Sequence, residues 1–443
     1  MKKKLLAFIL VVAMCISMVA CSKNNADNAT QTAGTKETAD ETAADDSIAD
    51  KASAEESKDP ITIEFWTLSL QPTFTDYING VIADFEKQYD YVTVKWSDLP
   101  YDAMQKKLVA AIAGKKAPDV VNLWTTMVLG MAGKGALTDL YKEAARDQLD
   151  IYQQGLFTSN EMNGGLYGFP WYVTPPITTY NKELLSKAGY EKPPVDYNEM
   201  FDMAKAVKDS TGAYLYVPNA MSQVLYSNGI QILTEDKTAV AFNTPEALDL
   251  LTKLQTGVKE GWMPKTDWNN WDNMIKLYAQ NKLATISLGA QTVTRIEKEA
   301  PDSVSKTEVA APLLGSAGIA QGALQSLVVT KDSKHHEEAI AFANFLSNDK
   351  NQLAFCKLAA IMPTTRAAAA DPFFTSDMET LDGRARAEAA KATAVSFDLG
   401  LGVEKENEVI SEIDGMFESI MQADKDPQTV LNDVEAKVNA LLK

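Results

Sequence analysis

The chain has 443 residues, of which 46% are hydrophobic, and a formal net charge of −18 at pH 7. This length exceeds what one hydrophobic core usually supports, so two domains are expected. The negative charge argues against nucleic-acid binding, because contacts to phosphates require basic patches. The two histidines, His335 and His336, are adjacent on a charged helix start, which argues against a His-dependent triad or a multi-histidine metal site.

The N-terminus has the features of a secretory signal. Lys2, Lys3 and Lys4 precede residues 5–20, which are apolar apart from Ser17, and Cys21 follows a small residue. The run is shorter than the roughly 20 residues that a membrane-spanning helix needs. Its end, Met-Val-Ala-Cys, resembles a bacterial lipoprotein signal, whose cysteine is acylated and becomes the mature N-terminus. Residues 1–21 are therefore expected to be a lipoprotein signal, with ordinary secretion and an incidental cysteine as the alternative.

Residues 22–59 are expected to form a disordered acidic tether. They hold ten acidic and four basic side chains, and Ile48 is their only large apolar residue. A segment of this composition cannot bury enough apolar surface to offset the entropy that it would lose on folding.

From Pro60 onward, strands alternate with helices. We expect strands at residues 61–66, 91–96 and 119–124. We expect helices at residues 75–89 and 102–119, and Gly114 is expected to close the second helix. This alternation indicates βαβ units and a mostly parallel sheet. Each strand is expected to end on a tryptophan, and ligands in such sheets lie beyond the carboxyl ends of the strands. The three tryptophans at these ends are Trp66, Trp96 and Trp124.

Residues 167–182, YGFPWYVTPPITTYNK, are expected to form a stiff extended segment that leaves one domain and enters another. The tandem proline at 175–176 fits poorly in a helix or a central strand, whereas the following ITTYN favours a strand. A Pro-rich loop on one larger domain is the alternative. Further along, Thr244 and Pro245 start a helix, residues 266–282 read as another, and residues 404–442 read as largely helical.

Several segments, taken in order, resemble the extracellular solute-binding proteins of bacterial sugar importers, the group that includes maltose-binding proteins. They cover most of residues 60–366 and include ITIEFW, FEKQYDYVTVKW, GKKAPDVVNLW, YGFPWYVTPPITTYNKELLSKAG, NKLATISLG and the late MPTTR. The resemblance implies an α/β fold of two lobes joined by a hinge, each a mostly parallel sheet flanked by helices. The expected lobes are residues 60–173 plus 311–363 and residues 174–310 plus 364–443.

Sugar pockets pair aromatic platforms with hydrogen-bonding side chains. The resemblance places Trp124 where family members contact sugar with an aromatic residue, and placement at a strand end favours Trp66. For each tryptophan the alternative is an ordinary core residue. The aromatic candidates are Trp66, Trp124, Trp171, Tyr172, Trp268 and Trp271. Trp268 and Trp271 are expected to lie three residues apart on one helix, with one packed inward and the other facing the cleft.

The polar candidates are Asp98, Asn219, Gln291, Gln321 and Arg366. Gln291 stands where family members often have an aromatic residue, and Thr174 where some sugar binders have a carboxylate. The glycines of residues 315–322 and 130–135 lack the spacing of a nucleotide loop, so no cofactor is expected.

The expected function is a lipid-anchored, extracytoplasmic receptor for a mono- or oligosaccharide. As the resemblance implies, the receptor is expected to act as a monomer, on the outer face of the cytoplasmic membrane, and to deliver sugar to the permease of an ABC importer. One rival is a surface glycan hydrolase that uses two carboxylates. The other is an importer receptor for a polyamine or a phosphate ester.

Overall fold

The computed structural model describes residues 58–266, 268 and 270–443, which fall in one compact unit, Ser57–Lys443. The expected signal with Cys21 and almost all of the tether lie outside the described residues. Within the described residues, no helix is both long and apolar enough to span a membrane.

A six-stranded sheet has the order β12-β6-β11-β3-β1-β2. Its first three strands along the chain are β1 (Ile61–Leu68), β2 (Val92–Leu99) and β3 (Val120–Trp124). Alternate residues point to opposite faces of a strand. Accordingly, Val120 belongs to one hydrophobic cluster, whereas Val121 and Leu123 belong to another. Helices cover these clusters, namely α1 (Thr75–Gln88), α2 (Tyr101–Ala113), α3 (Thr125–Gly133), α13 (His336–Leu346) and α14 (Asp349–Leu358).

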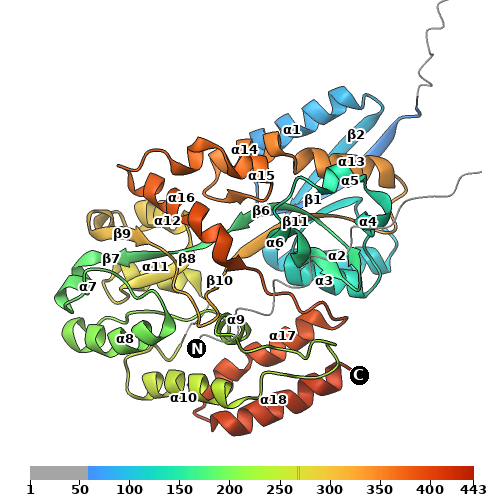
Figure 1. The fold of residues 1–443 in the computed structure, drawn as a ribbon. Helices are drawn as coiled ribbons and strands as arrows, with labels where there is room; N and C mark the ends of the chain where they lie inside the picture. Colours follow the sequence, from blue (N-terminus) through green and yellow to red (C-terminus); the bar gives the residue numbers. More distant parts are fainter. Residues whose placement is uncertain (1–57, 267, 269) are drawn as a thin grey trace, which may run out of the picture. The chain divides into compact units, whose positions relative to one another are not determined.

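The segment at residues 167–182 joins two sheets, and its predicted role as the crossing between two domains stays a prediction. Its first half is β6 (Phe169–Thr174) of the six-stranded sheet, and its second half is β7 (Pro176–Asn181), the central strand of a three-stranded sheet. Figure 1 shows β6 leading into β7, which lies between β8 (Thr285–Gly289) and β9 (Thr307–Ala310). Pro176 is tolerated because it is the first residue of its strand.

The expectation of mostly parallel sheets is only partly correct. β1 pairs in parallel with β2 and β3, but β11 (Ala323–Val329) runs antiparallel to both β3 and β6, and β12 (Met362–Pro363) runs antiparallel to β6. Both pairs of the three-stranded sheet are antiparallel. Parallel neighbours need a crossover connection such as α1 or α2, whereas β6, β11 and β12 reach their sheet from other parts of the chain.

A second large hydrophobic core lies on the side of the three-stranded sheet. It joins residues of β7 and β8 to helices that are distant in the sequence, including the C-terminal ones that were predicted to be helical. Thr244 caps α10 as predicted, because its hydroxyl accepts the N–H of Ala247 at 3.2 Å. The helices of this core are α7 (Lys182–Lys187), α8 (Tyr197–Thr211), α9 (Met221–Ser227), α10 (Pro245–Lys259), α11 (Trp271–Ala279), α12 (Gln291–Glu299), α17 (Glu406–Asp414) and α18 (Pro427–Leu441).

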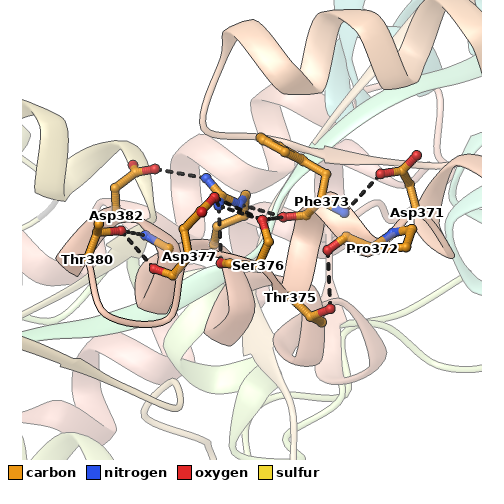
Figure 2. A network of polar contacts seen from close by, with 10 residues as sticks. Asp371, Pro372, Phe373, Thr375, Ser376, Asp377, Thr380 and Asp382 are labelled. Atoms are coloured by element: carbon orange, nitrogen blue, oxygen red, sulfur yellow. Dashed lines mark hydrogen bonds and ion pairs between the residues drawn. The ribbon is translucent and has the colours of Figure 1, made fainter.

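The loop before α16 (Leu381–Ala392) is fixed by its own polar contacts (Figure 2). Arg386 donates to the carboxylates of Asp377 and Asp382, each at 3.0 Å, and to the carbonyl of Phe373 at 2.9 Å. Thr380 caps the helix by accepting the N–H of Gly383. The charge of Arg386 is therefore matched by two carboxylates, and this loop offers no free cationic site.

Glu406 is fully buried at the start of α17, and its carboxylate accepts the N–H groups of Leu401 (2.7 Å) and Val403 (3.3 Å). Burial raises the pKa of this carboxyl to about 7 from its ordinary value of 4.5. Between these two pH values the folded protein keeps a proton that the unfolded chain has lost. The free energy of unfolding should therefore fall as pH rises through this window, by roughly 3 kcal/mol at 1.36 kcal/mol per pKa unit.

Urea unfolding of the wild type and Glu406→Gln across this pH range measures the effect. The glutamine cannot titrate, so the difference in stability between the two proteins should change by about 3 kcal/mol over the window. A difference that is independent of pH would show that Glu406 does not titrate there.

Candidate functional site

Two pockets contain four of the residues predicted to bind ligand. The first is small, with a volume of about 20 Å³, and contains Asn219 and Gln321. Its lining residues also include Tyr197, Tyr216, Ser227, Ser287 and Gln223, which carry hydroxyl or amide groups, and none of its lining residues is charged. Hydroxyl and amide groups without a net charge suit a neutral ligand that is rich in hydroxyl groups.

Gln321 belongs to β10 (Ala320–Gln321), which pairs in parallel with β13 (Ser396–Phe397). Its side-chain Nε2 donates to Asp398 Oδ1 at 2.9 Å and to the carbonyl oxygen of Gly322. Its Oε1 is buried and has no hydrogen-bond partner among the described residues. A buried acceptor without a partner is costly, so this oxygen can accept a hydrogen bond from a further donor.

The second pocket, with a volume of about 480 Å³, contains Tyr172 and Gln291. Its lining combines the apolar side chains of Leu70, Phe74 and Phe355 with Gln291 and Arg295 of α12. The ring of Tyr172 packs edge-on against Phe355, with centroids 5.4 Å apart. Burial raises the pKa of the Tyr172 phenol, so this side chain acts as a neutral hydrogen-bonding group.

Gln291 lies where the end of β8 meets β6. Its Oε1 is buried without a partner among the described residues, as is that of Gln321. A Cβ atom on Gly289 would lie 2.2 Å from Gln291 Oε1 and 2.2 Å from Thr174 Cγ2, so glycine is required for this close approach. Pro176 of the first pocket pairs with Gly289, two residues before Gln291 of the second pocket.

Trp66 and Trp124 are half-buried and pack against the same hydrophobic cluster. Trp124 ends β3, as predicted, and is the N-cap of α3. Trp66 does not end its strand, because β1 continues to Leu68, and Trp96 likewise precedes the end of β2. Trp124 pairs with Gln325 of β11, four residues after Gln321 of the first pocket.

Trp171 and Trp268 are core residues, which corrects their prediction as sugar platforms. Trp171 is fully buried and stacks on Phe355, with centroids 5.2 Å apart and planes 21° apart. Trp268 is buried, packs against Phe417 and donates its Nε1–H to the carbonyl of Pro264. Neither ring has a face exposed to a ligand in this conformation.

Trp271 is not three residues after Trp268 on a helix, because α11 begins at Trp271 itself with Asn270 as its N-cap. The Trp271 ring is half-buried, and the guanidinium of Arg295 lies 4.6 Å from its centroid. That cation–π contact occupies one face of the ring. A sugar could stack there only after Arg295 moved.

Asp98 and Arg366, two of the predicted polar contacts, are engaged in structural hydrogen bonds. Asp98 accepts the hydroxyl of Thr67 at 2.6 Å and the N–H groups of Leu70 and Gln71 at 3.0 Å each, which fixes the loop after β1. Arg366 donates to the carbonyl oxygens of Asp150 and Tyr152. It lines neither pocket.

Sequence reasoning missed Asp398, the carboxylate that holds Gln321. Its only signal is an acidic residue between Phe397 and Leu399 in the stretch SFDLGLG. Burial raises the pKa of Asp398, while hydrogen bonds from Thr125, Leu324 and Gln321 oppose that rise. Sequence reasoning also missed Arg295, which lines the second pocket and bonds to Asp272 and Glu299. Among the described residues, no group of three His, Cys, Asp or Glu side chains could hold a metal ion.

A family model described as bacterial extracellular solute-binding protein matches residues 80–381, which is more than half of the chain.

Comparison with individual proteins gives relatives of similar length. The diacetylchitobiose binding protein DasA of Streptomyces coelicolor is 23% identical over 90% of this chain and 88% of its own. One solved structure is that of a protein of Synechococcus sp. MITs9220 named as an oligosaccharide periplasmic-binding protein. It is 26% identical and has a TM-score of 0.79. The alignment covers 86% of this chain and 98% of that protein. The sugar-binding protein MalE of Xanthomonas citri is 24% identical, with a TM-score of 0.72 over 86% of this chain and 97% of its own. These likenesses place the chain in the two-lobed α/β fold that was predicted.

Proposed function

Because this chain belongs to the bacterial extracellular solute-binding protein family, we propose that it is the sugar-binding receptor of an ABC importer. It captures a neutral mono- or oligosaccharide and delivers it to the permease. The observation that carries this proposal is the first pocket, whose lining residues supply hydroxyl and amide groups but no charge. The names of its relatives support the same class of ligand.

The proposed site combines the two pockets with the half-buried rings of Trp66 and Trp124. Asn219 and Gln321 bond hydroxyl groups in the first pocket, and Tyr172 and Gln291 do so in the second. The buried oxygens of Gln291 and Gln321, which have no partner among the described residues, accept hydroxyl hydrogens. Sugar favours a closed form only if it contacts residues of both proposed lobes, 60–173 plus 311–363 and 174–310 plus 364–443.

Binding without chemistry fits the lining residues better than hydrolysis does. A glycosidase needs two carboxyl groups on either side of the scissile bond. The first pocket has no carboxylate among its lining residues, and the second has one, Glu299, which pairs with Arg295 at 2.8 Å. We therefore propose that the protein is not an enzyme. We also propose that it acts as a monomer and that an acylated Cys21 anchors it to the outer face of the cytoplasmic membrane.

One observation favours an anionic solute as a second candidate ligand, because Arg295 and Lys298 line the second pocket. Against it, the Arg295 guanidinium is already engaged by the carboxylates of Asp272 and Glu299. A phosphate ester would have to compete with both of these carboxylates. Arg366, the basic residue considered in the sequence, bonds to backbone carbonyls instead.

Calorimetry with the purified protein tests this function. The probes are maltose, cellobiose, lactose, diacetylchitobiose, glycerol 3-phosphate and spermidine. We expect micromolar or tighter binding of at least one neutral disaccharide and no binding of the charged solutes, with the disaccharide unchanged after prolonged incubation. Binding of only a charged solute would replace the sugar proposal, and repeated turnover of the disaccharide would establish an enzyme.

A further inference from the structure

Asp398 joins three segments that are far apart in the sequence. Its Oδ2 accepts the hydroxyl of Thr125 at 2.6 Å and the backbone N–H of Leu324 at 2.9 Å, and its Oδ1 accepts Gln321 Nε2 at 2.9 Å. Thr125 is the first residue of α3 and directly follows Trp124. The same carboxylate thus contacts the helix that follows the proposed aromatic platform and the strand that forms a wall of the first pocket.

The chemistry of a carboxylate fixes which way round the Gln321 amide lies. An ionised carboxylate can only accept hydrogen bonds, so the amide must turn its NH₂ group toward Asp398. The second hydrogen of that NH₂ group is donated to the carbonyl of Gly322. The remaining polar atom, Oε1, is the buried oxygen that has no partner among the described residues, and Gln321 lines the first pocket.

We infer that Asp398 is a positioning residue that sets the hydrogen-bond polarity of the first pocket. It orients the Gln321 amide so that Gln321 presents an acceptor. The pocket then selects a ligand that bears a hydroxyl or N–H donor at that point. This inference rests on the proposed function and specifies what its ligand must supply. Asp398 itself does not line the pocket. Its effect on binding passes through the amide of Gln321.

Replacing Asp398 with asparagine tests the inference, because the new side chain has an NH₂ group. The backbone N–H of Leu324 still requires an acceptor, so the asparagine oxygen stays near Leu324 and its NH₂ group faces Gln321. To accept that NH₂ group, the Gln321 amide turns over, which gives up its bond to the Gly322 carbonyl and presents NH₂ to the pocket. A ligand that only accepts hydrogen bonds at this point should therefore be tolerated by Asp398→Asn and rejected by the wild type.

The probes are the tightest-binding disaccharide of the calorimetric screen and its monodeoxyfluoro analogues, each with one hydroxyl replaced by fluorine. Fluorine is close to hydroxyl in size and cannot donate. For the wild type, we expect the analogue altered at the hydroxyl over Gln321 to lose about tenfold or more in affinity, because it leaves a buried acceptor unpaired. In Asp398→Asn that loss should shrink to about threefold or less.

Asp119→Asn is the matched control. Asp119 precedes β3 and, like Asp398, accepts a backbone N–H (Glu64, 2.8 Å) and a hydroxyl (Ser333, 2.6 Å), but it lines neither pocket. This variant should keep the wild-type pattern of analogue losses even if its stability falls. The inference is overturned if Asp398→Asn also keeps the wild-type pattern, since a purely structural carboxylate would change stability without changing which analogue is rejected.

A measurement without ligand separates failure of this inference from failure of the proposed function. In two-dimensional NMR spectra of the ligand-free protein, the side-chain NH₂ signals of Gln321, assigned by their loss in Gln321→Met, should move strongly in Asp398→Asn and stay in place in Asp119→Asn. Unmoved signals would overturn the inference whether or not any sugar binds. Moved signals together with a screen in which no sugar binds would leave the positioning role standing and reject the sugar.

Discussion

Replacing Trp124 with alanine is expected to weaken sugar binding by about 30-fold or more, because truncating a tryptophan hot spot costs about 2 kcal/mol or more. Trp124 ends β3 and caps α3, and its half-buried ring packs against the same cluster as Trp66. The next residue, Thr125, bonds to Asp398 at 2.6 Å, so the backbone at this position is held firmly. We propose that this ring stacks on the apolar face of a sugar, and a ring held in place would do so at little entropic cost.

Calorimetry with the best disaccharide of the screen measures this loss. Trp124→Phe, which keeps an aromatic face, should recover most of the affinity, and urea unfolding should show that both variants remain folded. Unchanged affinity in folded Trp124→Ala would mean that the sugar lies elsewhere in the protein.

The elements that local patterns specify were predicted well. Alternating apolar residues placed β1 and β2, a short apolar run placed β3, and the cap at Thr244 placed the start of α10. The ends of β1 and β2 were predicted too early. Polar residues follow Trp66 and Trp96 in the sequence, but the two strands stay paired with each other through Leu68 and Leu99. Pairing with a neighbouring strand is a tertiary effect that a single segment does not encode.

Four of the ligand contacts proposed from the sequence, Tyr172, Asn219, Gln291 and Gln321, line the two pockets, and their role in binding stays a prediction. What sequence reasoning could not find is which polar groups the fold already uses. Asp98 and Arg366 are engaged by backbone groups, and Asp398 meets Gln321 across 77 positions of the chain. Contacts of that separation leave no periodic pattern in the sequence.

Replacing Trp171 with alanine is expected to lower the free energy of unfolding by about 3–5 kcal/mol, the usual cost of removing a large buried aromatic side chain. The way in which β6 pairs with β11 explains why the Trp171 side chain is buried. Ser326 pairs with Pro170 and Gln325 with Tyr172, so the register shifts at Trp171. Pro170 lacks the N–H of a regular ladder, and a bulge of this kind re-aims a side chain, here toward the hydrophobic core.

Trp171→Phe distinguishes a core role from a ligand-binding role. The indole Nε1–H of Trp171 is buried without a partner among the described residues, and leaving such a group unpaired costs about 1–3 kcal/mol. Phenylalanine removes that group, which offsets part of the cost of the smaller ring. Urea unfolding should therefore show a loss well below that of Trp171→Ala, and calorimetry should show sugar affinity within about threefold of the wild type. A folded Trp171→Phe protein that had lost its sugar affinity would instead place this ring in the binding site and require the bulge to open when ligand binds.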